Sequence, residues 1–288
     1  MEGIQVLLPS HHQDEGEEEI QEIRQLDKLT PIDFKYYNEL SKEIDMYERR
    51  TYRNLVKSED LIKFEVMVKE TDLLVRAERD FSKETRESVL KYRHQLETYI
   101  ATTPEFQKSL LPFRDDPFAP EIVQEMIRTS QLALVGPMAA VAGAMAEWVS
   151  KDLLKLSEEV IVENGGDIYL ATSKERTIGI YAGNSPLSFK IGVVISPEES
   201  PLGVCTSSGT VGPSLSFGKA NAVCILSKSA ALADAAATAV GNVVKEKKDI
   251  ELGLERGKEI AGILGTLIIV EEKMGVWGNV KLTQLGMS

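Results

Sequence analysis

Cysteine and histidine are scarce in this chain, and their scarcity excludes several chemistries. The 288 residues include two cysteines, Cys205 and Cys224. Two widely spaced thiols provide neither a disulfide framework nor a four-ligand zinc site. The last of the three histidines is His94. The long segment after it therefore offers no histidine base for a Ser-His-Asp triad or for either cysteine.

Long apolar runs and an excess of positive charge are also missing. No run approaches 18 apolar residues, so we expect no membrane span. The acidic N-terminus does not resemble a signal peptide. A net charge of −12 argues against a broad nucleic-acid-binding surface, which would be basic. We therefore expect a cytoplasmic globular protein whose partners include neither nucleic acid nor membrane.

The chain divides by composition into two parts. Residues 1–33 have few apolar positions and several acidic ones, which predicts a flexible acidic arm. Residues 34–288 have the patterning of a single folded domain, for which a homo-oligomer is compatible with the sequence.

Hydrophobic periodicity predicts an α+β fold in which a mostly antiparallel sheet is layered with helices. No GxGxxG motif follows a strand, so a dinucleotide-binding Rossmann domain is not expected. Ser82 is expected to cap the first helix. The helical patterns cover 82–101, 120–134, 138–149, 230–241 and 245–264. The extended patterns cover 64–68, 73–77, 160–162, 168–171, 177–182, 189–195, 202–205, 222–226, 267–270 and 276–282.

A glycine-rich turn separates two of these strands. Asn164, Gly165, Gly166 and Asp167 lie between the apolar runs 160–162 and 168–171. Asn and Gly tolerate the positive φ angles of a tight hairpin. Two adjacent glycines also let a ligand approach bare backbone N–H groups. The turn is therefore either a plain hairpin or part of a binding site.

Two further polar segments stand out. Thr206, Ser207, Ser208, Gly209 and Thr210 follow a strand, where hydroxyls and backbone N–H groups form either a phosphate cradle or a plain Ser/Thr turn. Asp234 and Thr238 are one turn apart on an alanine-rich helix. If that helix is buried, the carboxylate needs a partner, and a carboxylate with a hydroxyl suits Mg²⁺. The alternative is an aspartate on a solvated face.

The helix at 138–149 is made mostly of small residues. Small side chains allow close approach to a sheet or a ligand, although close packing alone also explains them. The helix follows Gly136 and Pro137, and the free N–H groups of its opening turn are suited to an anion.

Taken in order, these segments resemble the ApbE-like superfamily, whose characterised members are Mg²⁺-dependent FAD:protein FMN transferases. The resemblance covers residues 47–282 and is strongest to an uncharacterised archaeal and bacterial branch. It implies an ApbE-like, T-fold-related domain that binds FAD or FMN. It also implies ligand contacts at the 164–167 turn and the 206–210 segment, and Mg²⁺ at Asp234 and Thr238. A protein acceptor for FMN is implied as well.

Two departures separate this chain from the transferases. They carry a Lys-Gly-Tyr-Ala-Val-Asp run on the small-residue helix, where the corresponding residues 141–147 of this chain include no Lys and no Tyr. They also carry a histidine after the Thr-Ser-Gly loop, where this chain has none. A flavin-binding or phosphate-binding protein that does not catalyse transfer is therefore the main alternative. A hydrolase using Ser207 or Ser208 is disfavoured by the lack of a base.

Overall fold

The computed structural model describes residues 56, 58, 60–208 and 218–285. The 1–33 arm and the beginning of the 34–288 domain lie outside these residues, as do Gly209 and Thr210. The arm and the domain boundary remain predictions.

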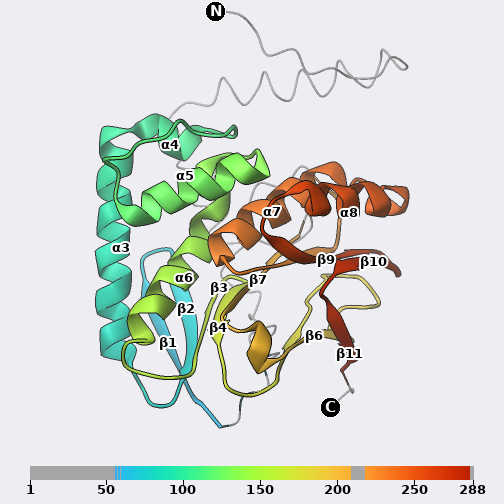
Figure 1. Ribbon diagram of the computed structural model, residues 1–288, viewed down its shortest axis with the longest axis horizontal. Coiled ribbons are helices and arrows are strands. Elements are labelled where there is room, and N and C mark those ends of the chain that lie inside the picture. The colour runs from blue at the N-terminus through green and yellow to red at the C-terminus, as the bar shows by residue number, and fades with distance from the viewer. Residues whose placement is uncertain (1–55, 57, 59, 209–217, 286–288) are drawn as a thin grey trace, which may run out of the picture. The chain divides into compact units, whose positions relative to one another are not determined.

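Among the described residues, eleven strands build two antiparallel sheets, and helices cover one face of the larger one (Figure 1). The eight-stranded sheet has the order β1-β2-β3-β4-β7-β8-β9-β10, and the small sheet has the order β11-β6-β5. The strands are β1 (Ile62–Val68), β2 (Thr71–Ala77), β3 (Val160–Asn164), β4 (Asp167–Ala171), β5 (Arg176–Gly179), β6 (Ile191–Ile195), β7 (Leu202–Ser207), β8 (Ala222–Ser227), β9 (Ile263–Val270), β10 (Lys273–Gly278) and β11 (Lys281–Gln284). The predicted α+β class is confirmed.

The described helices fall in two groups along the chain, one between β2 and β3 and the other between β8 and β9. They are α3 (Ser82–Thr102), α4 (Pro104–Lys108), α5 (Glu121–Ala133), α6 (Val141–Leu153), α7 (Ala230–Val243) and α8 (Ile250–Glu259), with 3₁₀ turns η2 (Pro137–Ala140), η3 (Pro197–Glu199) and η4 (Lys247–Asp249). Within the described residues no single helix is long and apolar enough to cross a membrane. The pair formed by α5 and η2–α6 reaches that length and composition but bends by 105° at its break.

The large sheet separates two hydrophobic cores, and its strands send alternate residues into each. Val160 and Val162 enter the core beneath the helices, whereas Ile161 between them enters the core beneath the small sheet. This period of two follows from the pleat of a strand. Helix α7 is apolar almost all round because it is buried within the helical layer and against β7 and β8.

One predicted cap and two predicted boundaries are wrong, each for a local reason. Asp80, and not Ser82, accepts from the amide at the start of α3. The 245–264 helix ends at Glu259, because Gly262 takes a positive φ and leads directly into β9. The 276–282 strand is two strands in different sheets, since the chain turns at Gly278, also with positive φ.

A buried ionic network ties the strand connections together at Arg176. Its Nη2 donates to Glu159 Oε2 over 2.7 Å and its Nε donates to Thr172 Oγ1 over 3.1 Å. Asp60 accepts from the same guanidinium group. Only 4% of Arg176 and 7% of Glu159 are exposed. Every oxygen of Glu159 has a donor, which is the condition under which a buried charge is tolerated.

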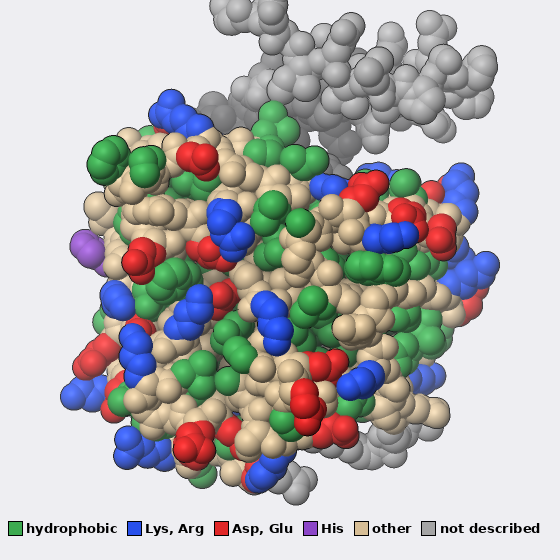
Figure 2. Space-filling model, viewed as in Figure 1, with side chains coloured by type: hydrophobic (Ala, Val, Ile, Leu, Met, Phe, Trp, Pro, Cys, Tyr) green, Lys and Arg blue, Asp and Glu red, His purple; other side chains and the backbone are tan. Residues whose placement is uncertain are grey.

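Positive and negative side chains are interspersed over the face seen in Figure 2. This face carries no large basic patch, in keeping with the acidic composition.

Candidate functional site

The glycine turn connects β3 and β4, which are neighbouring inner strands of the large sheet. Asn164 ends β3 and Asp167 begins β4, and the two are paired across the hairpin. Gly165 and Gly166 form the two-residue turn, with φ angles of 65° and 103°. An added Cβ at Gly165 would meet nothing within 4 Å, so one glycine faces open space. The predicted hairpin is confirmed.

The turn lies beside the Ser/Thr segment because β4 pairs with β7. Asp167 is opposite Cys205, and Thr206 is the next residue along β7. An added Cβ at Gly166 would lie 3.7 Å from the Thr206 carbonyl oxygen. Thr206, Ser207 and Ser208 are partly exposed at this end of the sheet. The structure thus brings together the described parts of two segments that the sequence singled out.

Helix α6 bonds both to the glycine turn and to Asp234 of α7, and so connects these two parts of the candidate site. The Asn164 Nδ2 donates to the Ala142 carbonyl oxygen over 3.1 Å. The next residue, Gly143, donates its backbone N–H to Asp234 Oδ2 over 2.9 Å. Thr238 is partly exposed one turn after Asp234. The first turn of α6 therefore binds the carboxylate of Asp234, an anion that the chain itself supplies.

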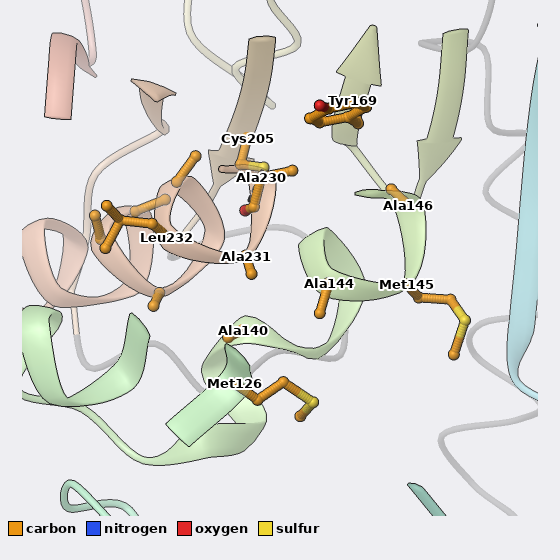
Figure 3. Packing of buried hydrophobic residues seen from close by; sticks show 14 of the residues in the cluster. Met126, Ala140, Ala144, Met145, Ala146, Tyr169, Cys205, Ala230, Ala231 and Leu232 are labelled. Carbon is orange, nitrogen blue, oxygen red and sulfur yellow. Dashed lines mark hydrogen bonds between the residues drawn. The ribbon is translucent and has the colours of Figure 1, made fainter. Parts of the chain in front are cut away.

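Small residues make this convergence possible. An added Cβ at Gly143 would lie 2.2 Å from the Ala230 carbonyl oxygen and 2.8 Å from the Asp234 Cβ. An added Cβ at Gly203 of β7 would lie 2.5 Å from the Ala230 Cα. Figure 3 shows Cys205 beside Ala230, with small side chains between α6 and α7. The small-residue helix is thus explained by close packing against α7.

The two aspartates have unusual electrostatics. Burial, and then repulsion from the charge of Asp234, raises the pKa of the Asp167 carboxyl well above its ordinary value. Burial also raises the pKa of Asp234, to about 7, although the backbone N–H groups of Gly143 and Ala142 oppose the shift. No Lys or Arg in the described part of the chain contributes to the shift of Asp234. Among the described residues, no Lys or Arg is therefore a main cause of the pKa shift of either aspartate.

The metal-free protein is expected to lose stability as pH rises from 5 to 8. An aspartate in the unfolded chain has a pKa of about 3.9. Because folding raises the pKa of Asp234, its contribution is present below the unfolded pKa and is lost as pH rises through the folded pKa. Asp234→Asn, which keeps an acceptor for Gly143, should abolish this loss and raise stability at pH 8 by roughly 2–4 kcal/mol. Urea denaturation at both pH values measures it.

Asp152→Asn is the matched control. Burial opposes the shift, but hydrogen bonds led by Lys155 and Tyr92 lower the pKa of Asp152 to about 2. Its contribution has the opposite sign: it is present above the unfolded pKa and lost as pH falls. The control should therefore lose stability at pH 8. If both variants respond to pH in the same direction, the electrostatic description of Asp234 is wrong.

The thiols and the described histidine are poorly placed for nucleophilic chemistry. Burial raises the pKa of the Cys205 thiol, which donates to the Ala230 carbonyl oxygen over 3.3 Å. Burial raises the pKa of Cys224 to about 12, and this residue enters the other core. His94 is exposed on α3. Ser207 and Ser208 gain no histidine base from the described residues.

The residues present fit a hard divalent cation. Asp234 accepts from the amide of Gly143 and also interacts with that of Ala142, and a carboxylate has further lone pairs with which to bind a ligand. Carboxylate, hydroxyl and carbonyl oxygens are the donors that Mg²⁺ prefers. Among the described residues no group of three or more His, Cys, Asp and Glu side chains is arranged to hold a metal. Any cation here would therefore also need hydroxyl, backbone, ligand or water oxygens.

Sequence reasoning missed Glu147 on α6. This buried carboxylate accepts from the backbone N–H groups of Ala230 and Ala231, at 2.8 and 3.3 Å. It therefore occupies the N-terminus of α7, where an external phosphate would otherwise bind. An acidic residue in a helix of small residues was its only sequence signal.

Sequence comparisons assign this chain to a protein family. The family described as AbpE bacteria matches residues 53–271. The chain belongs to this family. The UPF0280 protein MJ1526 of Methanocaldococcus jannaschii is 42% identical over 221 residues, which cover 75% of this chain and 90% of that one. A UPF0280 protein of Methanosarcina acetivorans is 43% identical over 202 residues, which cover 69% and 79%.

Solved structures resemble the fold. The flavinyl transferase ApbE of Pseudomonas stutzeri, in its apo form, has a TM-score of 0.51 at 16% identity, over 75% of this chain and 93% of that one. The flavin transferase ApbE of Vibrio cholerae has a TM-score of 0.52 at 14% identity, over 75% and 96%. The membership in the ApbE-like superfamily inferred from the sequence is confirmed.

Proposed function

We propose that this protein binds FAD, FMN or a related phosphate-bearing ligand where the glycine turn, the end of β7 and α7 meet. Support comes from one observation above all: the Gly165–Gly166 turn, Thr206 to Ser208 and Asp234 converge although they are far apart in the sequence. The flavin is suggested by the fold shared with solved flavin transferases. We place the protein in the cytoplasm.

Each residue has a proposed role. The amides of Gly165 and Gly166 and the hydroxyls of Thr206 to Ser208 would bind phosphate oxygens, because bare amides and hydroxyls are strong donors to anions. Gly209 and Thr210 belong to the same proposed segment but lie outside the described residues. Asn164 would hold the turn against α6, and Asp167 would orient the ligand.

Mg²⁺ would be held by Asp234 and Thr238. When bound, such a cation would stabilise the charge that develops on AMP, the group that leaves when the pyrophosphate of FAD is cleaved and FMN passes to the acceptor. It would also neutralise the carboxylate pair, so that an anionic ligand is not repelled. The protein's own contribution is to hold Asp234 against Gly143 and to keep Asp167 buried beside it.

The proposed reaction is FMN transfer from FAD to a protein acceptor. The second candidate is a ligand-binding or assembly protein without catalysis. This candidate is favoured by the small-residue helix, whose residues 141–147 include no Lys and no Tyr where the transferases carry both. It is also favoured because the described site contributes carboxylates, hydroxyls and amides but no histidine or lysine side chain.

Flavin binding tests the proposal. Fluorescence titrations of FAD and of FMN, each with Mg²⁺ and with EDTA, should show binding that Asp234→Asn weakens by about tenfold or more in Mg²⁺. Glu272→Gln, which removes a remote exposed carboxylate, is the control and should bind as wild type does. If neither flavin binds, the proposed ligand class is wrong.

Mass analysis then separates the two candidates. The protein is incubated with FAD, Mg²⁺ and a threonine-containing acceptor. A mass increase equal to FMN on the acceptor supports the transferase. FAD binding without any mass increase supports the non-catalytic binding protein.

A further inference from the structure

Helices α6 and α7 each supply a carboxylate to the other's N-terminus. Asp234 of α7 accepts from Gly143, the third residue of α6. Ala140, the N-cap residue of α6, makes no capping hydrogen bond with its side chain. Glu147 of α6 accepts from Ala230 and Ala231, the first residues of α7. The first N–H groups of a helix need such acceptors and attract negative charge.

The two carboxylates form two neighbouring contacts between α6 and α7. Gly143 and Glu147 are one turn apart on α6, and Ala230 and Asp234 are one turn apart on α7, so each pair shares a helix face. Between these two contacts, the Ala230 carbonyl leaves no room for a side chain at Gly143. A slide of α7 along α6 would therefore break both carboxylate contacts together.

Glu147 is itself firmly held. Its Oε1 lies 2.8 Å from the Lys151 Nζ, and its Oε2 lies 3.0 Å from the Ser229 Oγ. Only 3% of the residue is exposed. Glu125 also contacts the Ser229 hydroxyl, at 3.1 Å, without bonding to the described amides of α7, and so offers a matched comparison.

We propose that Glu147 is a positioning residue for Asp234. By anchoring the first turn of α7, it fixes the register in which Asp234 meets Gly143 and so holds the Asp234 carboxylate at the candidate site. The inference rests on the proposed function for the role of that carboxylate. The positioning itself concerns only contacts within the chain.

Residue-resolved amide exchange of the metal-free protein tests the positioning. Glu147→Ala should speed exchange at Gly143 about tenfold more than in the paired strands β8 and β9, because the loss is local. Glu147→Gln keeps a carbonyl acceptor and should stay within about threefold of wild type at Gly143. Glu125→Gln should leave Gly143 unchanged.

Binding of Mn²⁺, a probe for Mg²⁺, provides the second readout. Glu147→Ala should weaken it about tenfold, whereas Glu147→Gln and Glu125→Gln should not. Equal acceleration of exchange at Gly143 and in β8 and β9 would overturn the proposal, since Glu147 would then be a general stabiliser. Unchanged protection of Gly143 would also overturn it. If wild type binds no Mn²⁺, the proposed metal fails, while Gly143 exchange still decides the positioning.

Discussion

Arg176→Ala is expected to lower the free energy of unfolding by about 3–5 kcal/mol. The substitution removes the cation from a buried network and leaves the Glu159 carboxylate without its 2.7 Å partner. A buried charge that loses its counter-ion costs far more than the pair contributed. Urea denaturation at pH 7 measures the effect.

Lys174→Met is the matched control for Arg176. Lys174 also contacts Asp60, at 2.7 Å, but 62% of its side chain is exposed. An exposed ion pair contributes about 0–1 kcal/mol, so this control should remain close to wild type. Equal effects of the two substitutions would contradict the assignment of a buried network.

The Arg176→Ala effect should shrink in acid. Burial opposes the shift, but hydrogen bonds from Ser173, Arg176 and Thr172 lower the pKa of Glu159 in the wild type. A lowered pKa contributes stability above the unfolded pKa of about 4.3, and that stability is lost as pH falls through the folded value. Without Arg176, Glu159 can protonate on folding, so wild type and variant should converge toward pH 4. Arg176→Met combined with Glu159→Gln should recover part of the loss.

Gly143→Ala is expected to destabilise the protein by about 3 kcal/mol, at the upper end for a single added methyl group. The new Cβ would lie 2.2 Å from the Ala230 carbonyl oxygen and 2.7 Å from its carbon. These are backbone atoms and cannot rotate away, so α6 must separate from α7. Helix propensity alone would predict stabilisation by up to about 1 kcal/mol. The sign of the change in urea denaturation therefore separates the two effects.

Gly165→Ala is the comparison for Gly143→Ala. Its Cβ meets nothing within 4 Å, so its cost comes only from the positive φ and should be about 1–2 kcal/mol. A Gly143→Ala variant as stable as wild type would show that α6 and α7 are not in contact as described.

The local part of the site was predictable from the sequence. The Asn164–Asp167 turn, the Ser/Thr segment that begins at the end of β7, and the face shared by Asp234 and Thr238 depend on turn residues and helical spacing, which neighbouring residues encode. The strands beside the turn were predictable for the same reason. The roles of these residues toward a ligand stay predictions.

The contacts that join these segments were not predictable. Gly143 and Asp234 are 91 residues apart, and Asn164 bonds to a backbone carbonyl, which any residue type at 142 provides. Glu147 acts on backbone amides that have no sequence signature. Periodicity predicts which face of a helix is buried, but not which residue it meets.

The exchange of carboxylates between α6 and α7 has a consequence for how the protein folds. The exchanged contacts join residues 91 and 83 positions apart in the sequence, so they are complete only when the two helices have docked, although Ser229 also caps α7 locally. A ligand of Asp234 would recognise only the finished fold and would stabilise it by mass action. Thermal unfolding in the presence of the ligand would then shift as one cooperative transition, and ligand occupancy would report the fraction of fully folded molecules.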